Sequence, residues 1–241
     1  MLKLRLPFIW ILPVLLCCAF AAAQVTVTAR ATVAVAGKPG KVRDARNAAI
    51  WLTPMEDTTL SSLANVNNAR PRLLQRNKSF QPHVLVVRVG SKVEFPNRDP
   101  FFHNVFSLFE GKRFDLGLYE AGSTRDVQFD KPGVSYIFCN IHAEMSAVII
   151  AVNTPYYAVS DARGELLIPN VMPGRYALHV WYDGIPQDTL NAMTRTLTVS
   201  EESSTLGLLR LPSSSPTPPH KNMYGKDYTP PAPGSPTYEH P

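Results

Sequence analysis

Three side chains that bind soft metals lie within one short segment of the chain. Cys139, His142 and Met145 follow the spacing Cys-x2-His-x2-Met, with strand-like apolar residues before and after them. A thiolate, an imidazole and a thioether together suit copper, because sulfur ligands favour Cu(I), imidazole also binds Cu(II), and zinc rarely takes a methionine. A trigonal copper site needs one more imidazole, which must come from elsewhere in the chain.

His103 is the best candidate for that second imidazole. It precedes Cys139 by enough residues to lie on a different strand and to hold the metal between two parts of a β-sandwich. Two other histidines have simpler interpretations as structural residues. His83 begins an apolar strand, and His179 alternates with apolar residues in another.

The segment around these residues resembles the cupredoxins, the blue-copper proteins. Residues 80–97 look like the strand pair that precedes the first histidine ligand in plastocyanin-like members, and His103-Asn104 is similar to their ligand-plus-asparagine pair. The Cys-x2-His-x2-Met spacing is similar to that of amicyanin. The resemblance covers residues 72–152 and implies a Greek-key β-sandwich with one type 1 copper ion.

The resemblance also implies a role for each residue. Cys139 would be the dominant thiolate ligand, His103 and His142 the equatorial imidazoles, and Met145 the long axial thioether. His142 would be the ligand nearest to solvent and the port for electrons, and Asn104 would tie the His103 strand to the Cys139 loop. Four protein ligands leave no open coordination position for a substrate, so we expect an electron carrier and not an enzyme.

The ligand loop differs from amicyanin-like loops in two respects. It has no proline beside His142, so the rigidity that proline gives such loops is not assured by the sequence. Glu144 places a carboxylate beside the expected port, where many cupredoxins present an apolar patch to a partner. We expect a redox partner protein, whose identity the sequence does not specify.

Segments on both sides of the cupredoxin-like region read as β-strands. Residues 25–56 read as a hairpin, and residues 155–200 carry an Asp-x-x-Gly turn followed by Pro-Gly-x-Tyr-x-Leu-x-Val. They resemble carboxypeptidase-regulatory-like domains, which are small transthyretin-type β-sandwiches. We predict an all-β chain in which this sandwich is split and the cupredoxin is inserted, with residues 57–71 as a linker. The alternative is two successive domains, with residues 25–56 as extra edge strands of the cupredoxin.

The first 23 residues have the order of a secretory signal peptide. Lys3 and Arg5 precede an apolar run that ends in three alanines, which predicts cleavage after Ala23. The alternatives are a retained membrane anchor and lipid attachment at Cys17 or Cys18. Removal of residues 1–23 would leave a secreted or periplasmic protein without a permanent membrane span. It would also leave Cys139 as the remaining cysteine.

Composition supports a globular chain with a flexible end. Hydrophobic residues make up 45% and charged residues 18%, and the net charge of +5 is too small to indicate nucleic-acid binding. Residues 212–241 are rich in proline, which predicts a disordered or polyproline-like tail in which His220 and His240 hold no prearranged site. Two alternatives to electron transfer remain open: periplasmic copper binding or trafficking, and an interaction module that has lost its metal.

Overall fold

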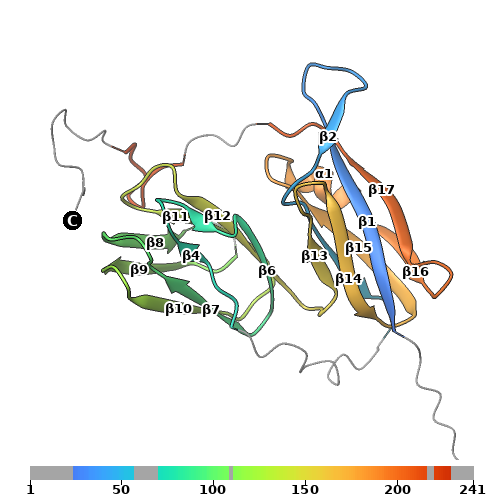
Figure 1. Cartoon of the computed structure of the whole chain (residues 1–241), viewed down its shortest axis with the longest axis horizontal. Helices are drawn as coiled ribbons and strands as arrows, with labels where there is room; N and C mark the ends of the chain where they lie inside the picture. Colours follow the sequence, from blue (N-terminus) through green and yellow to red (C-terminus); the bar gives the residue numbers. More distant parts are fainter. Residues whose placement is uncertain (1–23, 57–69, 109–110, 216–219, 229–241) are drawn as a thin grey trace, which may run out of the picture.

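The computed structural model describes residues 24–56, 70–108, 111–215 and 220–228. The predicted signal peptide (residues 1–23), nearly all of the predicted linker and residues 229–241 of the tail lie outside the described residues. Within the described ranges, none of the helical structure is both long and apolar enough to span a bilayer. Figure 1 shows two lobes, one drawn in green and the other in blue and orange.

The first lobe is built from strands that lie on both sides of the inserted segment. They are β1 (Val25–Ala34), β2 (Val42–Asp44), β3 (Ala49–Pro54), β13 (Tyr157–Val159), β14 (Glu165–Val171), β15 (Gly174–Trp181), β16 (Arg195–Val199) and β17 (Thr205–Leu211), with the short helix α1 (Gln187–Ala192). One sheet has the order β14-β1-β17, with β2 also paired to β1, and the other has the order β13-β3-β15-β16. We call this lobe the split sandwich.

Pairing across the insertion holds the split sandwich together. β1 runs antiparallel to β14 and parallel to β17. β3 runs antiparallel to β13 and β15. Inward residues follow the two-residue period of a strand: Ala31 and Val33 on β1 and Ile50 and Leu52 on β3 are all buried in one apolar core. Residues before and after the insertion therefore complete the same two sheets.

The second lobe, which we call the inserted sandwich, contains the expected metal ligands. Its strands are β4 (Leu74–Gln75), β5 (Phe80–Gln81), β6 (Val84–Arg88), β7 (Ser91–Pro96), β8 (His103–Ser107), β9 (Phe114–Tyr119), β10 (Thr124–Phe129), β11 (Gly133–Cys139) and β12 (Ser146–Val152). A five-stranded sheet has the order β6-β12-β11-β8-β9, and β7 pairs with β10. The all-β class predicted from the sequence is confirmed, with α1 as the one helix of the described residues.

Strand β12 packs against two cores at once. Val148 and Ile150 belong to the core of the split sandwich, whereas Ile149 and Ala151 belong to the core of the inserted sandwich. Every residue of β12 after Ser146 is buried. At β12 the outer face of the five-stranded sheet is therefore covered by the split sandwich, which joins the two lobes through apolar contact.

Candidate metal centre

Pairing of β8 with β11 brings His103 and Cys139 to the same face of the sheet. Cys139 lies opposite Val105 in the antiparallel register, and His103 is two residues before Val105 on the same strand. Side chains two apart on a strand, and directly opposed across strands, share a face. The Cys139 Sγ atom lies 3.6 Å from His103 Nδ1 and 3.6 Å from His142 Nδ1. The ligand atoms of these three residues all lie within 4.8 Å of one another.

A tight turn after β11, residues 140–145, returns the chain to Cys139, and we call it the ligand turn. The Asn140 N–H donates to the Asn104 carbonyl at 2.8 Å, and the Met145 N–H donates to the His142 carbonyl at 3.1 Å. The Cys139 N–H in turn donates to the Met145 carbonyl at 3.3 Å. Met145 is fully buried in the same core as Cys139. The turn thus places the backbone of Met145 beside the backbone of Cys139.

The four residues differ in exposure. His103, Cys139 and Met145 have no exposed surface, and His142 retains 9%. Among the four, His142 is the one that solvent or a partner can reach. Because these side chains are buried, little water can reach the donor atoms and compete with them for a metal.

Burial sets the protonation states in the absence of metal. It lowers the pKa of His103, and together with repulsion from His103 it lowers the pKa of His142 to about 4. Both imidazoles are therefore neutral at pH 7 and can offer lone pairs. Burial raises the pKa of Cys139, although backbone hydrogen bonds at Asn104, Ile141 and His142 oppose it. The free thiol is protonated at pH 7, and binding a metal would release that proton.

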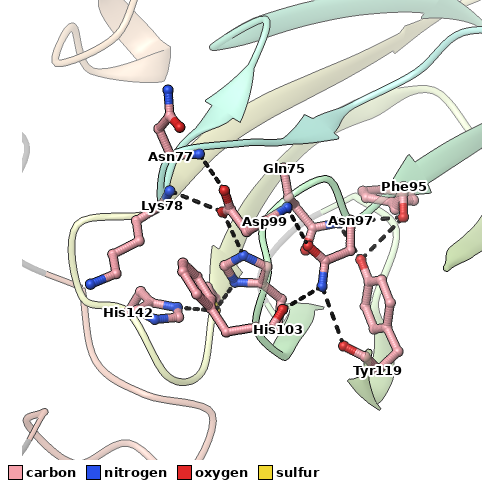
Figure 2. A network of polar contacts seen from close by, with 11 residues as sticks. Gln75, Asn77, Lys78, Phe95, Asn97, Asp99, His103, Tyr119 and His142 are labelled. Atoms are coloured by element: carbon pink, nitrogen blue, oxygen red, sulfur yellow. Dashed lines mark hydrogen bonds and ion pairs between the residues drawn. The ribbon is translucent and has the colours of Figure 1, made fainter. Parts of the chain in front are cut away.

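Asp99 determines which nitrogen of His103 faces the site. Asp99 Oδ2 lies 2.9 Å from His103 Nε2. Burial acts to raise the pKa of Asp99, but hydrogen bonds from His103 and from the Lys78 and Asn77 N–H groups outweigh it, and the pKa falls below its usual value. An ionised carboxylate only accepts hydrogen bonds, so Nε2 carries the proton and Nδ1 presents its lone pair toward Cys139. Figure 2 shows Asp99 between these backbone donors and the His103 ring.

The side-chain amides of Asn97 and Gln75 form a buried hydrogen-bond network next to Asp99. Asn97 Oδ1 accepts the Asp99 N–H at 3.0 Å, and Asn97 Nδ2 donates to the Phe101 carbonyl at 2.7 Å. Gln75 contacts the Tyr119 hydroxyl, and both bind the Phe95 carbonyl. Figure 2 shows this chain of contacts. Sequence reasoning assigned no role to Asp99 or Gln75, and the spacing of Asp99 four residues before His103 was the one available clue.

Asn104 acts differently from the expectation. Its backbone carbonyl accepts the Asn140 N–H, which ties β8 to the ligand turn. Its side-chain Nδ2 donates instead to Asp115 Oδ1 on β9 at 2.6 Å. The main chain of Asn104 therefore links β8 to the ligand turn, and its side chain links β8 to β9.

His83 and His179 are not members of the His103–Cys139–His142 cluster. His83 contacts the Ser146 carbonyl at 3.2 Å and Asp183 at 3.9 Å. His179 stacks on Trp51 with ring centroids 5.1 Å apart. The structural role given to these two residues stays a prediction.

The described part of the tail differs from the prediction of disorder. Residues 220–228 form hydrogen-bonded turns and contact the ligand turn through Met223 and Tyr228. The His220 ring stacks on Phe138. Proline and serine content did not reveal these contacts, because they depend on aromatic and amide groups spaced within a short non-proline stretch.

Comparison with known proteins gives one family match. The model described as polysaccharide lyase family 4, domain II, matches residues 150–206, which include β13–β16 of the split sandwich. This family is not the carboxypeptidase-regulatory-like family that the sequence resembles, and the match spans less than half of the chain. No curated protein matches the chain.

Several solved structures resemble part of the chain. A Cu-containing nitrite reductase from Thermus scotoductus SA-01 is 26% identical, over 36% of this chain and 23% of its own length, with a TM-score of 0.34. A purple cupredoxin from Nitrosopumilus maritimus is 20% identical over 34% of this chain and 99% of its own, with a TM-score of 0.32. An amicyanin variant is 18% identical over 37% of this chain and 88% of its own, with a TM-score of 0.33. The chain thus spans about a quarter of the nitrite reductase. These TM-scores are low, and the nature of the metal is a question for the side chains of the site itself.

Proposed function

We propose that the protein is an exported type 1 copper protein that transfers single electrons. One copper ion would be held by His103, Cys139, His142 and Met145. The observation that carries the proposal is the position of two imidazole Nδ1 atoms, each 3.6 Å from the Cys139 Sγ atom, in a buried pocket. Copper bound there would cycle between Cu(II) and Cu(I), gaining and losing one electron.

The donor set favours copper over other metals. One thiolate and two imidazoles form the trigonal set that blue-copper sites use, and the fully buried Met145 would supply the axial thioether. Structural zinc sites are instead closed by four thiolate or imidazole ligands. The described residues place no carboxylate in the cluster itself, since Asp99 contacts the far nitrogen of His103. A hard cation that needs oxygen ligands is therefore a poor fit.

The surroundings favour electron transfer. The pairing of β8 with β11, and the turn closed by Cys139 and Met145, hold the donors without a metal, so little rearrangement is needed between oxidation states. Four protein donors leave no coordination position for a substrate, which supports a carrier and not an enzyme. His142 is the most exposed of the four and is the proposed port to a redox partner protein.

The proposed location and scaffold follow from the sequence. The charged, apolar and small-residue pattern of residues 1–23 supports export to the periplasm or the outside. In such an oxidising compartment, metal binding would protect the lone buried thiol from oxidation. The carboxypeptidase-regulatory-like assignment of the split sandwich stays a prediction, and we assign that lobe a supporting role. Its apolar contact with β12 supports this role.

The decisive experiment is a Cu(II) titration of the metal-free protein with optical and paramagnetic resonance spectra. An intense visible thiolate-to-copper band with narrow hyperfine splitting is expected, and Cys139→Ser should abolish it. His179→Gln is the matched control, because that histidine stacks on Trp51 away from the cluster and should leave the band intact. Stoichiometric copper binding without the band would favour copper trafficking, and no binding would contradict any copper function.

A further inference from the structure

Two buried phenylalanines lie on the outer face of the ligand-bearing sheet. Phe106 on β8 and Phe138 on β11 face each other across the strands, with ring centroids 5.9 Å apart. They are 1% and 8% exposed, yet neither is a member of the two apolar cores formed by the described residues. Something else must therefore contribute to covering this end of the sheet.

Residues 220–228 supply cover at this end. The His220 ring stacks on Phe138 with centroids 4.1 Å apart and an interplanar angle of 26°. Figure 1 shows the segment, in red at the end of the colour scale, beside the inserted sandwich and away from β17, where the regular strands end. The cover comes from a part of the chain that follows the split sandwich.

The same segment binds the main chain of the ligand turn. The Tyr228 hydroxyl donates a hydrogen bond to the Cys139 carbonyl. The Met223 N–H donates to Asn140 Oδ1 at 2.9 Å. These contacts engage the residue that carries the thiolate and the residue after it, where the chain leaves β11.

Internal contacts give the segment a defined shape. Asn222 Oδ1 accepts the N–H groups of Tyr224 and Lys226, both at 3.0 Å, and the Asn222 N–H donates to the Lys226 carbonyl at 2.9 Å. Lys221 and Asp227 form an ion pair that closes the loop. The Tyr228 hydroxyl also lies 3.2 Å from His220 Nδ1, which joins the two ends. The loop therefore presents His220 and Tyr228 together.

The chain leading to this loop is anchored on the split sandwich. The Ser215 N–H donates to the Gly184 carbonyl at 2.9 Å. Gly184 has a φ of +76°, and a Cβ atom there would lie 2.1 Å from the Ser215 carbonyl oxygen, so the close approach requires glycine. One contact thus lies on the split sandwich and the other on the ligand turn.

We propose that residues 220–228 are a strap that holds the ligand turn closed over Cys139 and slows both access to the thiol and release of the metal. The turn has no proline of its own beside His142, and the strap supplies the restraint from outside. Tyr228 acts as a positioning residue through the Cys139 carbonyl. The inference rests on the proposed function only for the identity of the metal.

The test measures how fast Cys139 is alkylated in the metal-free whole chain. The thiol is fully buried, so iodoacetamide reacts only when the turn opens, and the rate reports the open population. Mass spectrometry of the peptide that contains Cys139 follows the reaction. Tyr228→Phe and Asn140→Ala each remove one hydrogen bond between strap and turn, and each should raise the rate roughly three- to tenfold.

Tyr224→Phe is the matched control. Tyr224 lies in the same strap but is 72% exposed, and no hydrogen bond of its hydroxyl is present among the described residues. This variant should react at the original rate. Unchanged rates in Tyr228→Phe and Asn140→Ala would overturn the strap, and so would an equal increase in all three variants, which would indicate general loosening.

A second measurement follows the metal. Transfer of Cu(I) from the loaded protein to a bathocuproine chelator should accelerate by a similar factor in Tyr228→Phe. Faster alkylation with unchanged copper transfer would overturn the role in metal release. Because alkylation needs no metal, a missing visible band in the original protein would contradict the proposed function and leave the strap standing.

Discussion

Asp99 Oδ2 lies 2.9 Å from Nε2 of His103, and both groups are buried. The contact leaves Nδ1 of His103 as the lone-pair donor beside the Cys139 thiol. A carboxylate behind a metal-binding imidazole orients the ring and increases its basicity. Because Asp99 is in turn fixed by two backbone N–H groups, the orientation of His103 is set before any metal binds.

Asp99→Asn should weaken copper binding and raise the reduction potential. The amide keeps the shape but removes the negative charge that stabilises Cu(II) more than Cu(I). We expect a loss of roughly 10- to 100-fold in Cu(II) affinity, as for other partners of metal-bound histidines. Competition titration and potentiometry measure the two quantities. Asp126→Asn, which alters an exposed carboxylate paired with Lys92, should change neither, and an unchanged affinity in Asp99→Asn would contradict the assigned role.

The metal-free protein should become less stable as the pH falls from 7 toward 4. The pKa of His142 is about 4 in the folded chain, against 6.5 for an unperturbed histidine. The unfolded chain therefore binds a proton in this window that the folded chain does not, so the free energy of unfolding falls with pH by at most about 3 kcal/mol, and solvent screening reduces this value. Urea unfolding at several pH values measures it. His142→Gln should show a shallower dependence, and equal slopes would rule out this origin.

Met145→Leu should keep the fold and the visible band but raise the reduction potential. Leucine has a similar volume, so this fully buried site should lose less than about 1.5 kcal/mol of stability. Loss of the axial electron pair destabilises the more highly charged Cu(II) more than Cu(I), which accepts three ligands readily, so the potential shifts upward. Potentiometry and thermal unfolding measure both effects. A potential identical to that of the original protein would show that Met145 is not a ligand.

The contact between the lobes should appear in paired alanine variants of β12. Ile150 faces the split sandwich and Ile149 faces the core of the inserted sandwich, and both are buried. Each change to alanine should cost about 2–5 kcal/mol. Only Ile150→Ala weakens the contact between the lobes, so its urea unfolding curve, measured by fluorescence, should separate into two transitions. Calorimetry should show the same separation on heating. A single transition in both variants would indicate coupling through other residues.

The candidate ligands could be selected from the sequence because their types and spacing are local properties. Cys139, His142 and Met145 lie within one turn, and His103 begins a strand whose partner ends at Cys139. The alternation of apolar residues likewise indicated the all-β class, since a strand places neighbouring side chains on opposite faces. Short-range pattern and side-chain chemistry carry this information together.

The supporting contacts were decided by the tertiary structure. Asp99 reaches His103 because the β4–β5 segment donates backbone N–H groups to it, and the strap reaches Cys139 from 89 residues further along the chain. Such contacts depend on how sheets and loops meet in space, which no local period encodes. The sequence by itself determined which atoms could bind a metal. The packing of distant segments decided how the His103 ring is oriented, why both imidazoles are neutral, and which residues cover Cys139.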